Sequence, residues 1–163
     1  MRVGIGYDSH RYAAGRKLIL GGVEIAHDKG LEGWSDADVV CHALTDAILG
    51  AAALGDIGRM FPPSDPRWRG ANSLDLLARA NLKVLEHGLA FHQGDVTVIC
   101  EQPRLGPYLE RMVDALAEAL VAGPTSISVK AKTNEGMGFV GRGEGVAAIA
   151  VAILQERKTT PSE

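Results

Sequence analysis

Three residues in the N-terminal part of the chain, Asp8, His10 and His42, have side chains of the types that bind metal ions. Asp8 and His10 are two positions apart, and the apolar residues Val3 and Ile5 before them favour a strand, in which alternate side chains leave the same face. One carboxylate and two imidazoles form a typical three-ligand zinc set, with the fourth position left for a substrate oxygen. The spacing alone leaves a second interpretation open, in which Asp8 caps a turn and both histidines are ordinary polar residues.

His42 falls in the first stretch with strong helical periodicity. We expect Ser35 to cap this helix, with Asp38 completing an approximate capping box, and the helix to end near Ala53. His42 and Asp46 are one turn apart and nearly opposite the apolar stripe, so they face away from the main core. This pattern favours either a solvated pair or a metal-bound imidazole whose ring is oriented by a nearby carboxylate.

The remaining periodicities alternate between strands and helices. We expect strands over 1–8, 90–101, 126–132 and 146–154, and two short strands within 17–25 around a turn at 21–22. We expect one helix over 73–87 and another that opens at 103–107 and ends at 123–124. The alanine-rich run 146–154 is compatible with a helix, but its valines and isoleucines and the glycines before it favour a buried strand. The order of elements predicts an α+β fold: a two-layer sandwich of one mixed β-sheet with helices on one face, a variant of the ferredoxin-like arrangement.

Composition restricts the class of protein. The 163 residues fit one domain, expected over 1–156, followed by a polar tail over 157–163. Cys41 and Cys100 lie in apolar segments without CxxC spacing, which is typical of a reducing compartment. No apolar run is long enough to span a bilayer, so we expect a cytoplasmic protein without a membrane partner. A net charge of −3 and 5% aromatic residues argue against a nucleic-acid partner.

The chain carries six short motifs in order: Asp8-Ser-His10, Ser35-Asp-Ala-Asp38, His42-Ala-Leu-Thr-Asp46, Gly55-Asp-Ile-Gly58, Lys130-Ala-Lys-Thr133 with Glu135, and Phe139-Val-Gly-Arg-Gly-Glu-Gly145. Together they closely resemble the 2-C-methyl-D-erythritol 2,4-cyclodiphosphate synthase family, over essentially the whole chain apart from the tail. The resemblance implies conversion of 4-diphosphocytidyl-2-C-methyl-D-erythritol 2-phosphate to the cyclic diphosphate and CMP, in the non-mevalonate route to isoprenoids. It also implies a homotrimer with active sites at the subunit interfaces.

The resemblance implies two kinds of metal ion. Asp8, His10 and His42 are then the ligands of Zn²⁺ or of another divalent ion, and Glu135 holds Mg²⁺ or Mn²⁺ on the diphosphate. Because the attacking 2-phosphate is already anionic near neutral pH, no strong general base is required. Bringing two phosphates together and neutralising their charge is the dominant requirement of phosphoryl transfer.

The family's substrate residues carry over onto this chain by position. Asp56, Ile57 and Gly58 would bind the methylerythritol hydroxyls, and the stretches 131–133 and 100–106 would bind the cytidine diphosphate. The full set of expected substrate residues is Asp8, His10, Trp34, Ser35, Asp56, Ile57, Gly58, Phe61, Asp65, Cys100, Arg104, Leu105, Gly106, Ala131, Lys132, Thr133, Asn134, Glu135, Phe139 and Arg142. Phe61 and Asp65 belong to a proline-rich flap over 61–66, and Phe139 either closes the far side of the site or plugs the core.

One position departs from the family near the chemistry. Trp34 stands where the family commonly has a histidine, which with the threonine matching Thr133 polarises the phosphates. An indole has one N–H donor and carries no positive charge, so Trp34 replaces at best a neutral hydrogen bond. We expect Trp34 and Thr133 to be the catalytic positions, with Ser35 and the metals supplying most of the stabilisation.

Two other functions compete with cyclisation. One is a metal-dependent phosphodiesterase that hydrolyses a nucleotide diphosphate with zinc-bound water. The other is a non-catalytic trimer that binds nucleotide or isoprenoid diphosphate. The family's central cavity, with the arginine matching Arg142 at its mouth, also implies an isoprenoid diphosphate as a further ligand.

Overall fold

A mixed five-stranded sheet forms one layer of the computed structural model, which describes residues 1–157. Its order is β4-β1-β7-β5-β6, and β6 runs parallel to β5 while β1, β5 and β7 pair antiparallel. The strands are β1 (Arg2–Ala14), β4 (Lys29–Leu31), β5 (Leu89–Ile99), β6 (Ile127–Lys132) and β7 (Gly145–Glu156). A separate two-stranded sheet pairs β2 (Leu18–Leu20) with β3 (Val23–Ile25).

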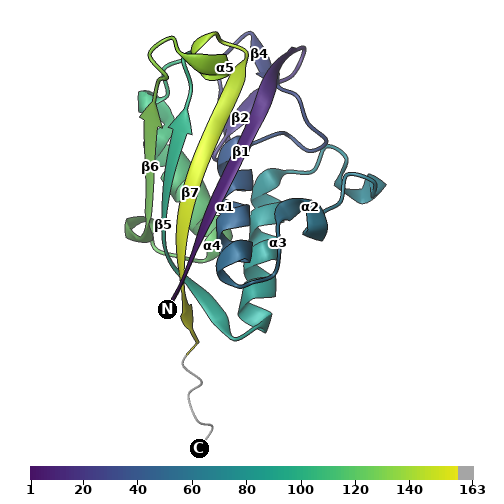
Figure 1. Cartoon of the computed structure of the whole chain (residues 1–163), viewed down its shortest axis with the longest axis vertical. Coiled ribbons are helices and arrows are strands. Elements are labelled where there is room, and N and C mark those ends of the chain that lie inside the picture. Colours follow the sequence, from purple (N-terminus) through teal and green to yellow (C-terminus); the bar gives the residue numbers. More distant parts are fainter. Residues whose placement is uncertain (158–163) are drawn as a thin grey trace, which may run out of the picture.

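Helices form the second layer, on one face of the large sheet (Figure 1). The long ones are α1 (Val39–Ala51), α3 (Ser73–Glu86) and α4 (Leu109–Leu120), and α1 packs against both β1 and β7. The short ones are α2 (Ile57–Met60), α5 (Gly138–Gly141) and the 3-10 turns Pro66–Trp68, Gly106–Tyr108 and Pro124–Ser126. The predicted α+β class, with one mixed sheet and helices, is therefore confirmed, and 146–154 is a strand as expected. Of the predicted tail, all but Arg157 lies outside the described residues.

The predicted cap of the first helix is wrong. α1 begins at Val39, and its N-cap is Asp38, whose Oδ1 accepts hydrogen bonds from the backbone N–H groups of Val40 and Cys41. The same carboxylate accepts from the N–H groups of Gly21 and Gly22, in the turn between β2 and β3. Asp38 thus accepts hydrogen bonds from N–H groups of both α1 and the turn between β2 and β3. A cap at Ser35 would leave these N–H groups without an acceptor.

Glycines in β1 allow α1 to approach the sheet unusually closely. A Cβ atom at Gly6 would lie 1.9 Å from the carbonyl oxygen of Ala43, and one at Gly4 would lie 2.0 Å from that of Ala47. Neither position has room for a side chain, so the backbone of β1 packs directly on α1. This contact brings the start of α1 over the middle of β1.

On the opposite face of the sheet, the part formed by β1 and β7 is apolar and bare within residues 1–157. On β1, Val3, Ile5 and Tyr7 are 64%, 72% and 53% exposed, and on β7 Ile149 and Val151 are 39% and 38% exposed. In the same part of the chain, no helix has both the length and the apolar character needed to cross a membrane.

Candidate metal centre and active site

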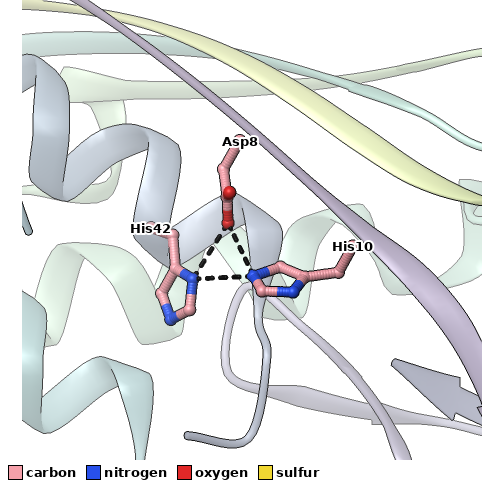
Figure 2. A group of neighbouring side chains, drawn as sticks. All are labelled: Asp8, His10 and His42. Carbon is pink, nitrogen blue, oxygen red and sulfur yellow. Dashed lines mark hydrogen bonds and ion pairs between the residues drawn. The ribbon is translucent and has the colours of Figure 1, made fainter. Parts of the chain in front are cut away.

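Asp8, His10 and His42 come together in one cluster, from two elements that are separate in the sequence. The strand β1 places Asp8 and His10 on its helix-facing side, and α1 directs His42 toward them (Figure 2). Asp8 Oδ2 lies 3.0 Å from His10 Nε2 and 2.9 Å from His42 Nδ1, and the two ring nitrogens are 3.2 Å apart. A carboxylate oxygen and two imidazole nitrogens therefore converge on one point, with all ligand atoms within 4.8 Å of one another.

The cluster is electrostatically coupled. Burial alone would raise the pKa of Asp8, but its hydrogen bonds with His10 and His42, together with the charges of both rings, hold that pKa well below its usual range. Burial would lower the pKa of His10, but the hydrogen bond and charge of Asp8 outweigh it and raise that pKa. The Asp8 carboxylate thus favours a positive charge beside it, in the place where a cation fits.

Each histidine is oriented by a partner on the far side of its ring. His10 Nδ1 lies 2.6 Å from the carbonyl oxygen of Glu32, which can only accept, so Nδ1–H donates and Nε2 is left as a metal ligand. His42 Nε2 lies 3.1 Å from Ser35 Oγ and 2.9 Å from Ser73 Oγ. These contacts leave Nδ1 of His42 directed at Asp8.

Asp46 does not orient the His42 ring, although the sequence favours this as one of two interpretations of the pair. Its Oδ1 accepts a 2.7 Å hydrogen bond from the backbone N–H of Ile57, and burial raises the pKa of its carboxyl. Asp46 instead fixes the start of α2, the helix that carries the expected sugar-binding residues. Serine hydroxyls hold the ring that Asp46 was expected to hold.

A cavity of about 220 Å³ opens beside the cluster. Besides the three metal-binding side chains, five further residues of the expected substrate set line it: Trp34, Ser35, Ile57, Gly58 and Phe61. Asp56 lies just outside, where its Oδ1 accepts from the N–H of Arg59 as the cap of α2, and Asp65 forms an ion pair with Arg67. Pro63, Trp68 and Leu76 line the cavity as well and were not expected.

A second cavity, of about 550 Å³, lies at the ends of β5 and β6. Of the residues expected there for the nucleotide, all but Gln102 line it: Cys100, Glu101, Pro103, Arg104, Leu105, Gly106, Ala131, Lys132 and Thr133. Asn134 and Glu135 follow directly, and the Thr133 hydroxyl donates a 3.1 Å hydrogen bond to Glu135 Oε1. Glu101 belongs to the expected stretch 100–106, and its Oε1 accepts from the backbone N–H of Asn134.

A model of the YgbB family matches residues 1–155. The chain belongs to this family.

Curated relatives and solved structures agree with that assignment. The chain is 55% identical to the 2-C-methyl-D-erythritol 2,4-cyclodiphosphate synthase of Symbiobacterium thermophilum, over 96% of this chain and 100% of the relative. It is also 55% identical to the bifunctional enzyme IspD/IspF of Desulforudis audaxviator, over 94% of this chain but only 39% of that longer protein.

The fold also matches solved structures of related proteins. The bifunctional IspDF of Campylobacter jejuni superposes with a TM-score of 0.92 at 41% identity, over 95% of this chain and 42% of that one. A 2C-methyl-D-erythritol-2,4-cyclodiphosphate synthase in a CDP-bound form superposes with a TM-score of 0.87 at 40% identity, over 94% of this chain and 100% of that one.

Within one copy of this YgbB-family chain, the metal cluster and the second cavity share no lining residue and lie on strands that are not neighbours. β7 lies between β1 and β5, so at least two strand spacings, about 10 Å, separate the strands that carry them. Glu135 is therefore absent from the group of converging ligands found among residues 1–157. Phe139 lies nearer, because it shares a hollow of about 290 Å³ with Ser9 and His10, while Arg142 Nε donates a 2.6 Å hydrogen bond to Glu144.

Ser73 is the functional neighbour that sequence reasoning missed. It is 0% exposed and contacts His42, which is 31 positions away in the sequence. In the sequence Ser73 follows Asn72, which caps α3, and so has the pattern of an ordinary residue in a first helical turn. No local signal could have identified it.

Proposed function

We propose that this chain performs the cyclisation associated with the YgbB family. It converts 4-diphosphocytidyl-2-C-methyl-D-erythritol 2-phosphate to 2-C-methyl-D-erythritol 2,4-cyclodiphosphate with release of CMP, in the non-mevalonate route to isoprenoids. The single observation that carries the proposal is the convergence of Asp8, His10 and His42 beside a cavity lined by Ile57 and Gly58, two of the three expected sugar residues.

The donor set fits Zn²⁺. Zinc takes carboxylate oxygen and imidazole nitrogen ligands, and a three-ligand set leaves one position for a substrate oxygen. His10 Nδ1 and His42 Nε2 both have polar partners on their far sides, as metal-bound imidazoles require. Zinc here, with Mg²⁺ or Mn²⁺ on Glu135, would neutralise phosphate charge and hold the diphosphate for in-line attack.

The chain's own residues bind and orient the substrate. The Asp56 carboxylate and the N–H of Gly58 suit the methylerythritol hydroxyls. Lys132 and Arg104 supply positive charge at the second cavity, and the Thr133 hydroxyl can donate to a phosphate oxygen. Because the attacking phosphate is ionised, these groups need only bring it to the β-phosphorus of the diphosphate and stabilise the charge of the transition state.

Trp34 contributes a neutral indole N–H at the mouth of the first cavity. The guanidinium of Arg69 lies over its ring, 5.8 Å from the centroid, which brings a positive charge to the position where the family commonly has a histidine. We therefore infer that the Trp34 site works without a titratable ring, through Ser35, Thr133 and the metals.

The functional unit is a homotrimer in this proposal. The bare apolar face of β1 and β7 needs a partner, and a neighbouring copy can bring its second cavity to the metal cluster, which lies on a different strand within one chain. The central space of such a trimer, with Arg142 at its mouth, would be the site for an isoprenoid diphosphate. We also infer one domain over 1–156 and a cytoplasmic location, since Cys41 and Cys100 are free and buried.

Phosphorus NMR of the purified protein with the diphosphocytidyl substrate, Zn²⁺ and Mg²⁺ tests the activity. We expect CMP and cyclic diphosphate, and a loss of at least about a hundredfold in His42→Ala, since removing a metal ligand removes charge stabilisation from the transition state. His92→Ala changes an exposed histidine that lines neither cavity, and should leave the rate unchanged.

The same assay separates the alternatives. In ¹⁸O-labelled water, cyclisation leaves both products unlabelled, whereas a phosphodiesterase would incorporate the label. Saturable CDP binding without any CMP release would favour the non-catalytic trimer. In Trp34→His we expect the rate of CMP release to change by less than about tenfold. A gain of several orders of magnitude in this rate would show that Trp34 strongly reduces catalysis in the natural chain.

A further inference from the structure

A chain of hydrogen bonds leads from His42 away from the metal cluster. His42 Nε2 contacts Ser73 Oγ at 2.9 Å, and the Ser73 hydroxyl in turn donates to Asp36 Oδ1. The backbone N–H of Ser73 donates to the other oxygen, Asp36 Oδ2, at 3.0 Å. The carboxylate of Asp36 therefore accepts hydrogen bonds from both the N–H and the hydroxyl of Ser73, which is 37 positions away in the sequence.

The Asp36 carboxylate determines which atom donates in each of these hydrogen bonds. An ionised carboxylate can only accept, so the single proton of the Ser73 hydroxyl is committed to Asp36. Toward His42, Ser73 Oγ then offers only lone pairs, and His42 Nε2 must be the N–H donor. A neutral imidazole with its proton on Nε2 has its free lone pair on Nδ1, the nitrogen that faces Asp8 and His10.

Ser35, the second hydroxyl near His42 Nε2, is not constrained in this way. Its Oγ accepts a 3.1 Å hydrogen bond from the backbone N–H of Ala37, and no carboxylate accepts its proton among the described contacts. Ser35 also lines the first cavity, whereas Ser73 does not. Its proton is thus available either to His42 or to a substrate oxygen.

We propose that Asp36 and Ser73 form a positioning pair that holds His42 in the tautomer and orientation able to bind metal through Nδ1. The inference rests on the proposed function only in taking the Asp8, His10 and His42 cluster as a metal site. Neither Asp36 nor Ser73 touches the substrate cavity, so both act through His42. Without Ser73, the Ser35 hydroxyl can donate to Nε2 and favour the tautomer whose proton blocks Nδ1.

Zinc affinity of the purified protein, measured by competition with a chromogenic chelator, tests the pair. Ser73→Ala and Asp36→Asn should each weaken Zn²⁺ binding about 10- to 100-fold, the range typical of partners that orient a ligating histidine. Matched controls are Ser128→Ala and Asp114→Asn, which make the same changes on β6 and α4, away from the cluster, and should bind zinc as the unchanged chain does.

The double variant Ser73→Ala with Asp36→Asn separates a chain of contacts from two independent effects. Asp36 Oδ1 also accepts a 3.3 Å hydrogen bond from the backbone N–H of Asp38, but it contacts the His42 ring only by way of Ser73. The double variant should therefore bind zinc no more weakly than Ser73→Ala alone. The d–d absorption of the Co²⁺-loaded protein gives a second signal, since a reoriented His42 ring changes the ligand field. At saturating Co²⁺ we expect altered bands in Ser73→Ala and unaltered bands in both controls.

The outcomes are distinct. Unchanged zinc affinity and Co²⁺ spectra in Ser73→Ala and Asp36→Asn, or losses that multiply in the double variant, would overturn the positioning pair while leaving the proposed function intact. A lower melting temperature of the metal-free variants with normal metal binding would assign Asp36 and Ser73 a purely structural role. Absence of a saturable zinc site in the unchanged chain would overturn the proposed function and the pair together.

Discussion

His10 and His42 present different ring nitrogens to the same point, and each is prepared for this by a different kind of partner. The Glu32 carbonyl accepts from Nδ1 of His10, which leaves Nε2 for the metal. Serine hydroxyls contact Nε2 of His42, which leaves Nδ1. Asp8 lies between the two rings and bonds to both. The metal geometry is thus set by contacts on the outer side of the cluster.

Zinc binding should depend on pH through His10. Its pKa in the metal-free protein is raised above 6.5, so zinc must displace a proton below that raised pKa. We expect zinc affinity to fall about tenfold per pH unit on the acid side and to level off above it. The measurement is a series of chelator competitions between about pH 5.5 and about pH 8.5, where histidines titrate.

The stability of the metal-free protein should have the opposite dependence. Because the pKa of His10 is raised by folding, the pairing of protonated His10 with Asp8 is fully present below pH 6.5 and is lost as pH rises through the raised pKa. His10→Gln should remove this loss of stability in urea unfolding. If zinc affinity levelled off at or below pH 6.5, the pKa of His10 would not be raised, and both expectations would be contradicted.

At the scale of elements, the site depends on how closely α1 lies on β1. The missing side chains at Gly4 and Gly6 allow backbone to contact backbone, and this separation sets the distance from His42 to Asp8. At the N-terminus of α1, Asp38 joins the helix to the turn between β2 and β3. A change in either contact moves one ligand relative to the other two.

Gly6→Ala should therefore damage both stability and metal binding. The added Cβ would lie 1.9 Å from the Ala43 carbonyl oxygen, so α1 must shift, at a cost of about 1–3 kcal/mol in the free energy of unfolding. Because the shift carries His42 away from Asp8, zinc affinity should fall as well. Urea unfolding and chelator competition measure the two effects.

The matched control is Gly50→Ala, which adds a Cβ to α1 itself. Its Cβ would lie 4.0 Å from the Ile5 carbonyl oxygen, an ordinary contact, and alanine favours the helix by about 0.5–1 kcal/mol. Equal stability and zinc affinity in Gly6→Ala and Gly50→Ala would show that the close approach of α1 does not position the ligand.

At the scale of the whole molecule, one sheet has two different faces. Helices cover the face that carries the metal cluster, and the other face exposes Val3, Ile5 and Tyr7 without a cover among residues 1–157 (Figure 1). The two cavities lie over different strands of this sheet. Assembly through the bare face is the arrangement that would join them into one active site.

Ile5→Lys should prevent this assembly. A lysine in the middle of an apolar interface leaves a buried charge without a partner, so we expect monomers in sedimentation velocity and loss of CMP release. Zinc affinity should stay within a few-fold of the unchanged chain, because all three ligands belong to one copy. Leu82→Lys, at a 58% exposed position of α3, is the control and should remain trimeric. Sedimentation of the unchanged chain as a monomer would contradict the trimer.

Local spacing was enough to predict several features of this protein from its residues alone. Strand alternation puts Asp8 and His10 on one face, helical periodicity predicts the helix that carries His42, and the residues of 146–154 favour a strand over a helix. These patterns depend on neighbours within a few positions, so they can be recognised without coordinates. The ordered motifs identified the family and with it most of the residues that line the two cavities.

The meeting of distant groups, in contrast, could be read only from the folded chain. The cap at Asp38 depends on N–H groups of Gly21 and Gly22, and the contact of Ser73 with His42 spans 31 positions. The separation of Glu135 from the metal cluster depends on the order of the strands. A hydrogen bond between remote residues leaves no periodic signal in the sequence, because folding of the whole chain, rather than local geometry, brings its two partners within reach.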